Sequence, residues 1–340
     1  MYMKEIQGKK VFYIKGLSDH KTSTVASMDP YYRNIRVSMP GNNNLDNFGS
    51  LPNARNINVC LNGQPFKMDV PDIVVNCMAD PDSLEDRLKY LGSILPKFKQ
   101  RNPNVKIINA PEGILKTSRN DISDLFQGLK DVIVPKVVKV FPTSRRDFIE
   151  KIKASGLKLP VIVRAAGTHN GIGLTRLDDF SDEQIEQLDK FALNGGGHYI
   201  TEFFNFQSPD GYYRKVRIIM LGGKPCIKHM LVSDHWNVHG TSRVTVMGKH
   251  PRFTEEEEKV LKKGNNNFSK DALESMQKIY KTLDLDVFGL DVSILPKGKL
   301  VVFEINAAME FLTTNIPQPK QVMQQIEKIR SGFFECVSSN

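Results

Sequence analysis

The segment from residue 288 to residue 306 constrains the fold of this chain more than any other part of the sequence. Two β-rich runs flank a Lys-Gly pair at 297–298, a pattern that is typical of a hairpin with a two-residue turn. In that register Asp291 lies directly opposite Glu304 on the neighbouring strand. Asn306 lies two residues further on and therefore shares their face of the sheet.

Carboxylates that lie directly opposite one another on a half-buried sheet repel each other unless something positive lies between them. The oxygen atoms of Asp, Glu and Asn side chains on one face are the ligands that a hard divalent cation prefers. We therefore predict that Asp291, Glu304 and Asn306 bind Mg²⁺ or Mn²⁺, with water and phosphate oxygens as the other ligands. The alternative is a pair of solvated carboxylates on an exposed sheet face.

A glycine-rich segment precedes this hairpin in the sequence. Gly167, Gly171 and Gly173 lie between two expected strands, residues 161–165 and 174–177. Because the segment does not open a helix, it differs from a Rossmann or P-loop glycine run. Its glycines allow close backbone approach and expose N–H donors, so the loop could fold over phosphates. The alternative is an ordinary mobile hairpin loop.

Positive charge supports a phosphate-binding role for this part of the chain. Arg164 ends a strand that is expected to be buried, where a charge needs an anionic partner. The formal net charge is +9, and residues 125–160 alone contribute +5, from eight basic and three acidic residues. This stretch is either part of a nucleotide-phosphate subdomain or a solvated face. We expect no nucleic-acid partner, because the basic residues are not interleaved with aromatic ones.

The composition is that of a globular protein with a sizeable core. At 340 residues, with 40% hydrophobic and 25% charged residues, the chain is long enough for two or three subdomains. It begins with a polar stretch and has no run of about 18 apolar residues, so we expect neither a signal peptide nor a membrane span. The sequence leaves a homo-oligomer open. Reduced thiols and a cytoplasmic location are favoured by the wide spacing of Cys60, Cys77, Cys226 and Cys336.

Hydrophobic periodicity predicts an open α/β domain in the first third of the chain. Residues 72–78 and 105–109 are short apolar runs that read as buried strands. Between them, apolar residues recur at helical spacing over 84–98, after Asp82 and Ser83, which are typical N-cap residues. Strand, helix and strand over this distance form a βαβ unit.

From residue 132 the pattern changes to strands and helices in an α+β order. The acidic run at 255–258 and the asparagines at 265–267 read as a solvated helix and its loop. Ser269 is the expected cap of a helix with one apolar face. The expected strands are 132–140, 161–165, 174–177, 198–204, 213–221 and 224–232, and the expected helices are 145–154, 181–192, 269–283 and 320–329.

The order of these motifs carries a specific resemblance. The strand that ends in Arg164, the glycine loop, residues 199–204, residues 213–218 and the Asp…Glu-x-Asn hairpin follow one another as in the ATP-grasp superfamily. Over residues 109–310 the chain is similar to the branch that contains ribosomal-protein-S6-type glutamate ligases and glutathione synthetases. The resemblance implies a mixed α/β and α+β architecture. Its parts are a pre-ATP-grasp α/β domain at 1–124, an ATP-grasp N-terminal lobe with the glycine loop at 125–206, and a C-terminal lobe with the magnesium-binding hairpin at 207–335.

The resemblance also implies roles for individual residues. Asp291, Glu304 and Asn306 match magnesium ligands of the family. Arg217 matches an arginine near the triphosphate and the acyl-phosphate intermediate, and is therefore the catalytic candidate. Arg164 stands where relatives more often have a lysine on the α-phosphate. The segment between the lobes contacts adenine, partly through main-chain groups. The implied nucleotide-binding residues are Arg164, Gly167, Thr168, His169, Asn170, Gly171, Gly173, Glu202, Phe203 and Phe204.

The acceptor side of the site is less defined. Lys215 stands where several relatives have an acidic residue, so Asp210 is a substitute candidate for the ribose contact. Lys136 and Lys139 are both candidates for a further phosphate contact, and the sequence does not choose between them. Relatives bind the acceptor substrate just after the strand pair that corresponds to residues 213–221 and 224–232. The segment 233–240 is therefore either a substrate-pocket loop or a surface loop. The tentative substrate-binding residues are Lys215, His235, Trp236 and His239, and the two histidines lack a third metal ligand.

The resemblance implies an ATP-dependent carboxylate–amine ligase that acts on an amino acid or peptide. Such an enzyme phosphorylates a substrate carboxylate with ATP, and an amine then attacks the acyl phosphate. One alternative is a kinase on the same scaffold that phosphorylates a small hydroxyl substrate. The other is a nucleotide-binding protein without turnover, against which the set of Asp291, Glu304 and Asn306 argues.

Overall fold

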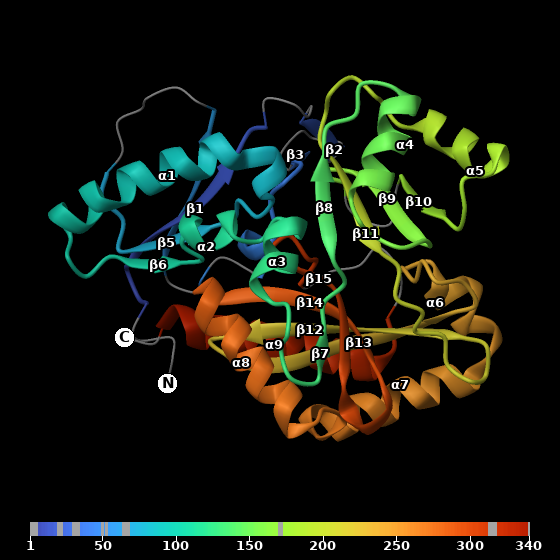
Figure 1. Ribbon diagram of the computed structural model, residues 1–340. Helices are drawn as coiled ribbons and strands as arrows, with labels where there is room; N and C mark the ends of the chain where they lie inside the picture. Colours follow the sequence, from blue (N-terminus) through green and yellow to red (C-terminus); the bar gives the residue numbers. More distant parts are fainter. Residues whose placement is uncertain are drawn as a thin grey trace.

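The computed structural model describes residues 6–18, 23–28, 35–48, 51, 54–62, 69–168, 173–311 and 318–338 of the chain. Three sheets organise most of these residues, and helices lie beside each of them (Figure 1). A further antiparallel pair consists of β2 (Thr24–Met28) and β3 (Ile35–Ser38). The mixed α/β architecture is the expected fold class.

The first sheet is parallel and has the strand order β4-β1-β5-β6. The predicted βαβ unit is confirmed, because β5 and β6 are neighbours and the predicted apolar face of the helix between them is buried. The strands are β1 (Lys10–Gly16), β4 (Arg55–Leu61), β5 (Ile73–Asn76) and β6 (Lys106–Ile108). The helices of this part are α1 (Pro81–Arg101), α2 (Pro111–Leu115) and α3 (Arg119–Leu125).

The predicted cap of α1, at Asp82 and Ser83, is wrong, because the true cap lies two residues before Asp82. The helix begins at Pro81, whose fixed φ suits the first helical position. Asp80 is the cap, and its side chain accepts a hydrogen bond from the Asp82 N–H (3.0 Å). The Asp82 side chain therefore does not cap the helix and makes contacts outside it.

The second sheet is antiparallel and has the strand order β10-β9-β11-β8. Its side chains, with Phe148 and Leu188, form a hydrophobic cluster that is separate from the main core. We call residues 137–202 the central lobe. Its strands are β8 (Val137–Val140), β9 (Val161–Ala165), β10 (Leu174–Leu177) and β11 (His198–Glu202), and its helices are α4 (Arg145–Ala154) and α5 (Asp182–Glu186), the latter shorter than expected.

The single strand predicted over residues 132–140 is wrong, because the chain divides there between two sheets. β7 (Val132–Ile133) pairs with a strand of the third sheet, whereas β8 pairs with β11 in the central lobe. Pro135 lies between the two strands and has no N–H to donate to a ladder. This short segment is therefore a connection between two sheets.

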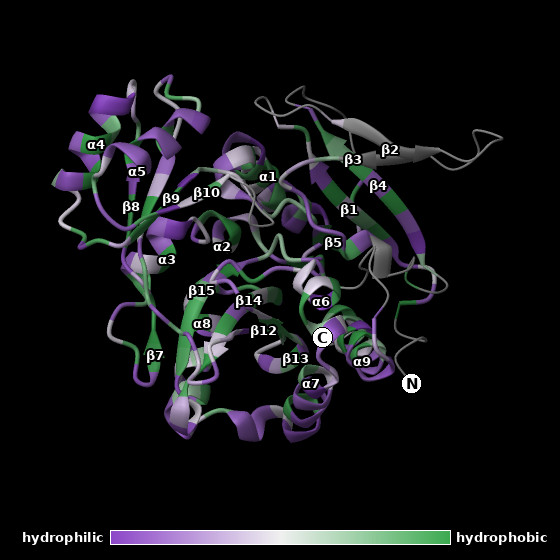
Figure 2. Ribbon diagram, turned by 90° about the vertical axis from the view of Figure 1, so that its right-hand side faces the viewer, coloured by the Kyte–Doolittle hydropathy of each residue, from purple (hydrophilic) through white to green (hydrophobic). Residues whose placement is uncertain are grey.

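The third sheet has the strand order β13-β12-β14-β15-β7. The predicted turn at residues 222–223 is confirmed, and so is the Ser269 cap, which accepts a hydrogen bond from the Ala272 N–H (3.0 Å). In Figure 2, β15 is coloured as mainly hydrophobic, whereas α4 and α5 are mainly hydrophilic. The strands are β12 (Tyr213–Leu221), β13 (Lys224–Ser233), β14 (Val287–Ile294) and β15 (Leu300–Asn306), and the helices are α6 (Ser242–Thr245), α7 (Pro251–Lys263), α8 (Lys270–Leu283) and α9 (Lys320–Ser338).

The hairpin of β14 and β15 has the predicted residue pair but not the predicted turn. Three residues, 296–298, form the turn, so Ile294 pairs with Leu300, one residue out of the predicted register. A β-bulge further along the ladder restores the register, and Asp291 pairs with Glu304 as predicted. Two deviations of one residue therefore cancel at this pair.

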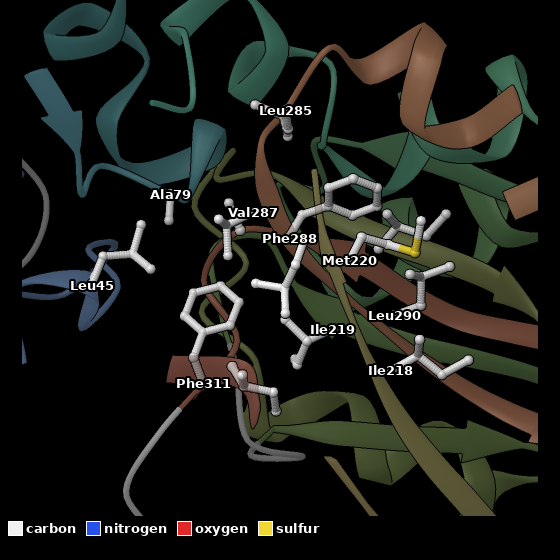
Figure 3. Close-up of a cluster of buried hydrophobic side chains, with 14 of the residues drawn as sticks. Leu45, Ala79, Ile218, Ile219, Met220, Leu285, Val287, Phe288, Leu290 and Phe311 are labelled. Atoms are coloured by element: carbon white, nitrogen blue, oxygen red, sulfur yellow. The ribbon is translucent and has the colours of Figure 1, made fainter. Parts of the chain in front are cut away.

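The first and third sheets share one hydrophobic core. Figure 3 shows Leu45 and Ala79, from the first part of the chain, beside Val287 and Phe311. All four side chains are buried and belong to the same cluster. These two sheets are therefore packed together, whereas the central lobe has its own cluster.

A buried asparagine adds hydrogen bonds to this packing. Asn109 Nδ2 donates to the Val287 carbonyl (2.7 Å), and the Val287 N–H donates to Asn109 Oδ1 (2.8 Å). The Asn109 N–H also donates to Asp286 Oδ2 (2.8 Å). The φ of Asn109 is 58°, in the left-handed region that asparagine tolerates better than most residues. The side chain of Asn109 thus pairs with the third sheet in the manner of a strand backbone.

The cysteines of the chain are all free thiols, and Cys77 is buried. Within the parts of the chain that the structure describes, no helix is both long and apolar enough to cross a membrane.

Candidate active site

A cavity of about 510 Å³ is lined by residues from the first part of the chain, the central lobe and the third sheet. Most of the predicted site residues meet there, although the sequence separates them by up to about 140 positions. The predicted residues in the lining are Arg164, Gly167, Thr168, Glu202, Phe203, Phe204, Lys215, Arg217, Trp236, His239, Asp291, Glu304 and Asn306.

Other candidates are not in the lining. Gly173 and His235 do not line the cavity. Asp210 does not line it either and pairs with Arg214, so it is not placed for a ribose contact within this cavity. The remaining glycine-loop candidates, His169, Asn170 and Gly171, lie outside the described residues.

Residues from four neighbouring strands form a row across the third sheet. His229 of β13 pairs with Arg217 of β12, and Arg217 pairs with Asp291 of β14. Asp291 in turn pairs with Glu304 of β15. Because neighbouring strands lie about 4.8 Å apart, the row extends over about 14 Å. All four side chains line the cavity, so the row forms its floor.

The sequence did not single out His229, and the reason is a β-bulge. A regular hairpin that turns at residues 222–223 places Lys228 opposite Arg217. The register shifts between Arg217 and Ile218, and this shift brings His229 into the row instead. His229 is 7% exposed, and its Nδ1 has no hydrogen-bond partner among the described residues. Burial, and then the nearby Arg217, hold the pKa of His229 well below its usual range.

Asp291 is a buried carboxylate with two cationic partners. Arg217 donates from Nε to Oδ1 (2.8 Å) and from Nη2 to Oδ2 (3.0 Å). Lys215 Nζ lies 3.0 Å from Oδ2. Burial alone would raise the pKa of Asp291, but the two cations hold it well below its usual range. Asp291 therefore stays ionised and fixes the orientation of Arg217.

Glu304 has a different cationic partner, which no sequence motif indicated. Arg119, at the start of α3, places Nη2 2.5 Å from Glu304 Oε1. Asn306 Nδ2 donates to the same oxygen (2.6 Å). Arg119 is 185 residues away from Glu304 in the sequence, and only the packing of α3 beside β15 brings the two together.

The donor set on the floor suits a hard divalent cation in its chemistry. Asp291, Glu304 and Asn306 provide carboxylate and amide oxygens on one face of the sheet. Within the described residues, no group of three His, Cys, Asp or Glu side chains is placed to hold a metal ion. A cation at this position would therefore depend on the two carboxylates, the amide and oxygen ligands from a bound molecule.

Arg164 is a buried guanidinium on the central-lobe side of the cavity. It is 7% exposed, and among the described residues its hydrogen bonds go to Thr168 alone, from Nε to Oγ1 (3.3 Å) and from Nη2 to the carbonyl. Burial, and then Arg119, lower the pKa of Arg164 to about 9. The expected burial of this strand end is therefore confirmed, whereas the anionic partner that the sequence predicts for Arg164 stays a prediction.

The segment between the lobes begins where β11 ends. The Glu202 N–H donates to the Lys136 carbonyl (2.9 Å), and the Phe203 N–H donates to the Pro160 carbonyl (3.2 Å). Main-chain carbonyls at the edge of the central lobe therefore engage these two N–H groups. Lys136 itself is exposed and does not line the cavity.

Aromatic side chains surround this segment. The Arg176 guanidinium lies 4.3 Å from the centroid of the Phe203 ring. The Trp236 ring meets Phe203 edge to face, with 5.9 Å between the centroids. Trp236 thus connects the loop after β13 to the segment between the lobes. Among the described residues, neither His235 nor His239 belongs to a group of metal ligands.

A buried ion pair supports the next part of the cavity wall. Arg243 of α6 donates from Nη1 and Nη2 to the two carboxylate oxygens of Glu257 (2.9 and 2.8 Å). Glu257 is fully buried and also accepts a hydrogen bond from the Met230 N–H (3.0 Å). The interpretation of the acidic run as a solvated helix is therefore wrong for Glu257, which faces inward from α7. Arg243 lines the cavity, so this pair fixes α6 at its wall.

Asp82 of α1 contributes to the wall on the side of the central lobe. Lys139 Nζ lies 2.7 Å from Asp82 Oδ1, and the Tyr199 hydroxyl lies 2.7 Å from each carboxylate oxygen. The Gly167 N–H donates to Oδ2 (3.4 Å). Of the two lysines that the sequence left open, Lys139 is therefore the one beside the glycine loop.

Comparisons with known proteins identify solved structures whose fold is similar to that of this chain. No family model matches the sequence, and no curated protein sequence matches it. D-alanyl-alanine synthetase A from Vibrio cholerae is similar in structure, with a TM-score of 0.54 and 11% sequence identity over 97% of this chain and 98% of that one. The D-alanine–D-alanine ligase from Bacillus anthracis has a TM-score of 0.50 and 12% identity over 97% of both chains. For a RimK domain ATP-grasp protein from Sphaerobacter thermophilus the TM-score is 0.50 and the identity 11%, over 96% of this chain and 99% of that one. Because these similarities extend over nearly the whole chain, the protein has the ATP-grasp fold that its motifs implied.

Proposed function

We propose that the protein is an ATP-dependent carboxylate–amine ligase that forms a C–N bond through an acyl phosphate. The observation that carries this proposal is the cavity floor, where Asp291 and Glu304 lie in one row with Arg217, opposite the buried Arg164. Oxygen ligands for a divalent cation and guanidinium groups for phosphates therefore face one space. Two proteins that share the fold carry ligase or synthetase names, which supports the choice of reaction class.

We place ATP between the central lobe and the third sheet. Arg164 and the glycine loop, of which Gly167 and Thr168 are described, would contact its phosphates through charge and backbone N–H groups. Phe203 and Phe204 would lie beside the base. Asp291, Glu304 and Asn306 would hold Mg²⁺ or Mn²⁺, which neutralises charge on the phosphate oxygens when bound.

Nucleotide binding then requires the ion pairs of the floor to rearrange. Arg217 and Lys215 are paired with Asp291, and Arg119 is paired with Glu304. Phosphate oxygens compete for these three cations, and each cation that turns to a phosphate frees carboxylate oxygens for the metal ion. The internal pairs thus hold the charged groups of the site at the floor before they are needed.

The reaction would proceed in two steps. A substrate carboxylate oxygen attacks the γ-phosphorus of ATP, the bond to ADP breaks, and an acyl phosphate forms. An amine then attacks the acyl carbon, phosphate leaves, and the nitrogen loses a proton. Arg217 would stabilise negative charge on the transferred group in both steps, because the pair with Asp291 holds its guanidinium at the floor until a phosphate replaces the carboxylate. The glycine loop would exclude water, which otherwise hydrolyses an acyl phosphate.

The acceptor contacts follow from the same lining. Lys215, Trp236 and His239 line the cavity on the side of the third sheet and are the proposed contacts to the carboxylate or amine substrate. Burial, and then Lys215, lower the pKa of His239, so its imidazole is neutral and can accept a hydrogen bond at neutral pH. His235 is not proposed, because it does not line the cavity.

A screen of amino acids and peptides, with ADP release and product masses recorded, tests the proposal. A ligase releases ADP and free phosphate only when carboxylate and amine are both present, and its product has lost one water. Hydroxylamine in place of the amine should trap the acyl phosphate as a hydroxamate. A product that is heavier by one phosphoryl group, without free phosphate, would instead identify a kinase. Arg217→Met should abolish turnover, whereas Arg146→Met, at a side chain that is 91% exposed on α4, should not.

A further inference from the structure

The surroundings of Asp82 resemble a phosphate-binding site in their chemistry. Lys139 Nζ lies 2.7 Å from one carboxylate oxygen, and the Tyr199 hydroxyl lies 2.7 Å from both. The Gly167 N–H donates to Oδ2 at 3.4 Å. An ammonium group, a hydroxyl and a loop N–H that converge on one anion are donors with which proteins bind phosphate oxygens.

All three donors belong to the central lobe, whereas the anion comes from outside it. Lys139 is on β8, Tyr199 is on β11, and Gly167 follows β9. Asp82 lies in the first turn of α1, on the first part of the chain. The lobe therefore has an arrangement of donors around an anion that it does not itself supply.

The donors are held in position by their own packing. Tyr199 is 1% exposed, and burial, followed by the charge of Asp82, raises the pKa of its hydroxyl, which stays protonated as a donor. Lys139 Nζ lies 5.5 Å from the centroid of the Tyr199 ring. A Cβ at Gly197 would come within 3.2 Å of Lys139 Cε, so the glycine leaves room for the lysine stem. The set is therefore preorganised for an anion.

We propose that Lys139, Tyr199 and the Gly167 N–H form a phosphate subsite for which Asp82 and a nucleotide phosphate compete. This inference rests on the proposed binding of ATP, and it assigns the open choice between the two lysines to Lys139. Asp82 and Gly167 line the cavity, whereas Lys139 and Tyr199 do not, so a phosphate on the nucleotide side reaches these two donors only when the Asp82 carboxylate moves away from them. Asp82 fills the subsite in the structure.

Competition by Asp82 weakens phosphate binding in two ways. The ion pair of Asp82 with Lys139 must open before a phosphate takes the lysine. The freed carboxylate then lies close to the incoming phosphate, and like charges side by side are unfavourable. Both effects disappear when the carboxylate is replaced by a neutral group. A residue that only anchors the lobe would behave in the opposite way, because its loss would loosen the site.

The test compares Asp82→Asn and Asp82→Ser with Asp86→Asn, a change at an exposed carboxylate on the same helix. Calorimetry measures the affinity for Mg-ATP and for adenosine, which has no phosphate. We expect both Asp82 variants to bind Mg-ATP about tenfold more tightly than the wild type, a change of about 1.4 kcal/mol. Affinity for adenosine, and every affinity of Asp86→Asn, should match the wild type.

Hydrogen exchange supplies a second readout without nucleotide. Amides of residues 161–168 and 198–202 should exchange faster in Asp82→Asn than in Asp86→Asn, because the contact between Asp82 and the lobe is lost. Mg-ATP affinity that is equal to or weaker than that of the wild type overturns the competition while the proposed function stands. Loss of the folded state in both Asp82 variants also overturns it, because Asp82 is then an anchor. If the wild type and all variants fail to bind Mg-ATP, the proposed function itself fails and takes the subsite with it.

Discussion

Asp291 and Glu304 face each other across β14 and β15, and each is neutralised by a different arginine. Arg217 approaches Asp291 from the neighbouring strand, whereas Arg119 approaches Glu304 from α3. The repulsion expected between the two carboxylates is therefore offset by cations of the chain itself. A divalent cation at this pair has to compete with two internal partners, and this competition makes the metal proposal testable.

Replacing Glu304 by glutamine removes a proposed metal ligand and leaves Arg119 without that carboxylate. We expect the affinity for Mg-ATP to fall about tenfold or more, because a divalent cation loses one of its few protein ligands. Calorimetry with and without magnesium measures the change. The control is Glu258→Gln, at a more exposed carboxylate on α7. Undiminished affinity of Glu304→Gln for Mg-ATP contradicts the metal assignment.

Arg164→Ala should weaken ATP binding and leave the fold intact. The change removes a guanidinium that has no carboxylate partner among the described residues, so we expect a loss of about 2 kcal/mol in binding, roughly 30-fold. Arg164→Lys should retain part of the affinity, because the charge remains although the fork of donors does not. Arg146→Ala is the matched control at an exposed position. Wild-type affinity in Arg164→Ala would show that this strand end has no phosphate role.

Trp236 offers a direct optical test, because it is the only tryptophan of the chain. Its ring lines the cavity and meets Phe203, so a base that binds beside Phe203 should change the indole emission. Titration with ATP should shift or quench the fluorescence with the same midpoint that calorimetry gives. Trp236→Leu should remove the signal and weaken ATP binding. An emission spectrum that is unchanged at saturating ATP argues against a base near this ring.

The buried pair of Arg243 and Glu257 should be important for stability. Glu257→Gln leaves a buried guanidinium without its carboxylate, which typically costs about 3 kcal/mol or more. Glu258→Gln, one residue further along α7, should change stability by less than about 0.5 kcal/mol. Urea unfolding of both variants measures the free energies. Equal stabilities would mean that Glu257 is not held as the structure shows.

Lys228 should give the protein a pH-dependent stability. The residue is fully buried, its Nζ donates to the Glu310 carbonyl (2.6 Å), and burial, followed by Arg217, lowers its pKa from 10.5 to about 8. Between these two values the unfolded chain binds more protons at this site than the folded chain, so stability rises with pH, by about 1.4 kcal/mol per unit. Below about pH 8 both forms are protonated and the contribution is constant. Relative to Lys228→Met, the wild type should gain stability from about pH 8 to about pH 9.5, and parallel curves would contradict the shift.

Local sequence patterns were sufficient to predict many of the strands and helices and part of the candidate site. The strands at 161–165, 174–177 and 213–221 and the helix at 145–154 have the predicted bounds, because alternation and caps are properties of neighbouring residues. The pairing of Asp291 with Glu304 was also predicted correctly, although the two-residue turn on which that prediction rested is wrong. The predicted register was correct there only because a longer turn and a bulge cancel.

The contacts that the sequence did not reveal connect residues far apart in the chain. Arg119 meets Glu304 through packing of a helix, Asp82 meets Tyr199 across two parts of the molecule, and neither contact has a local signal. His229 was not predicted because a β-bulge shifts the strand register and places it opposite Arg217, and a periodic pattern in the sequence does not reveal a bulge. Glu257 lies in an acidic run that reads as solvated, and its contacts with Arg243 and the Met230 N–H explain its burial.

The hydrogen bonds of Asn109 and the shared core have a consequence for how this molecule comes apart on heating. The first and third sheets enclose one cluster of apolar side chains, and the central lobe encloses another. Cooperative melting follows the cores and not the order of segments along the chain. Scanning calorimetry should therefore resolve at most two transitions. The first hundred residues should also not survive as a separately expressed fragment, nor be exchangeable for those of a relative, because Leu45 and Ala79 share their core with Val287 and Phe311, which the chain reaches only much later.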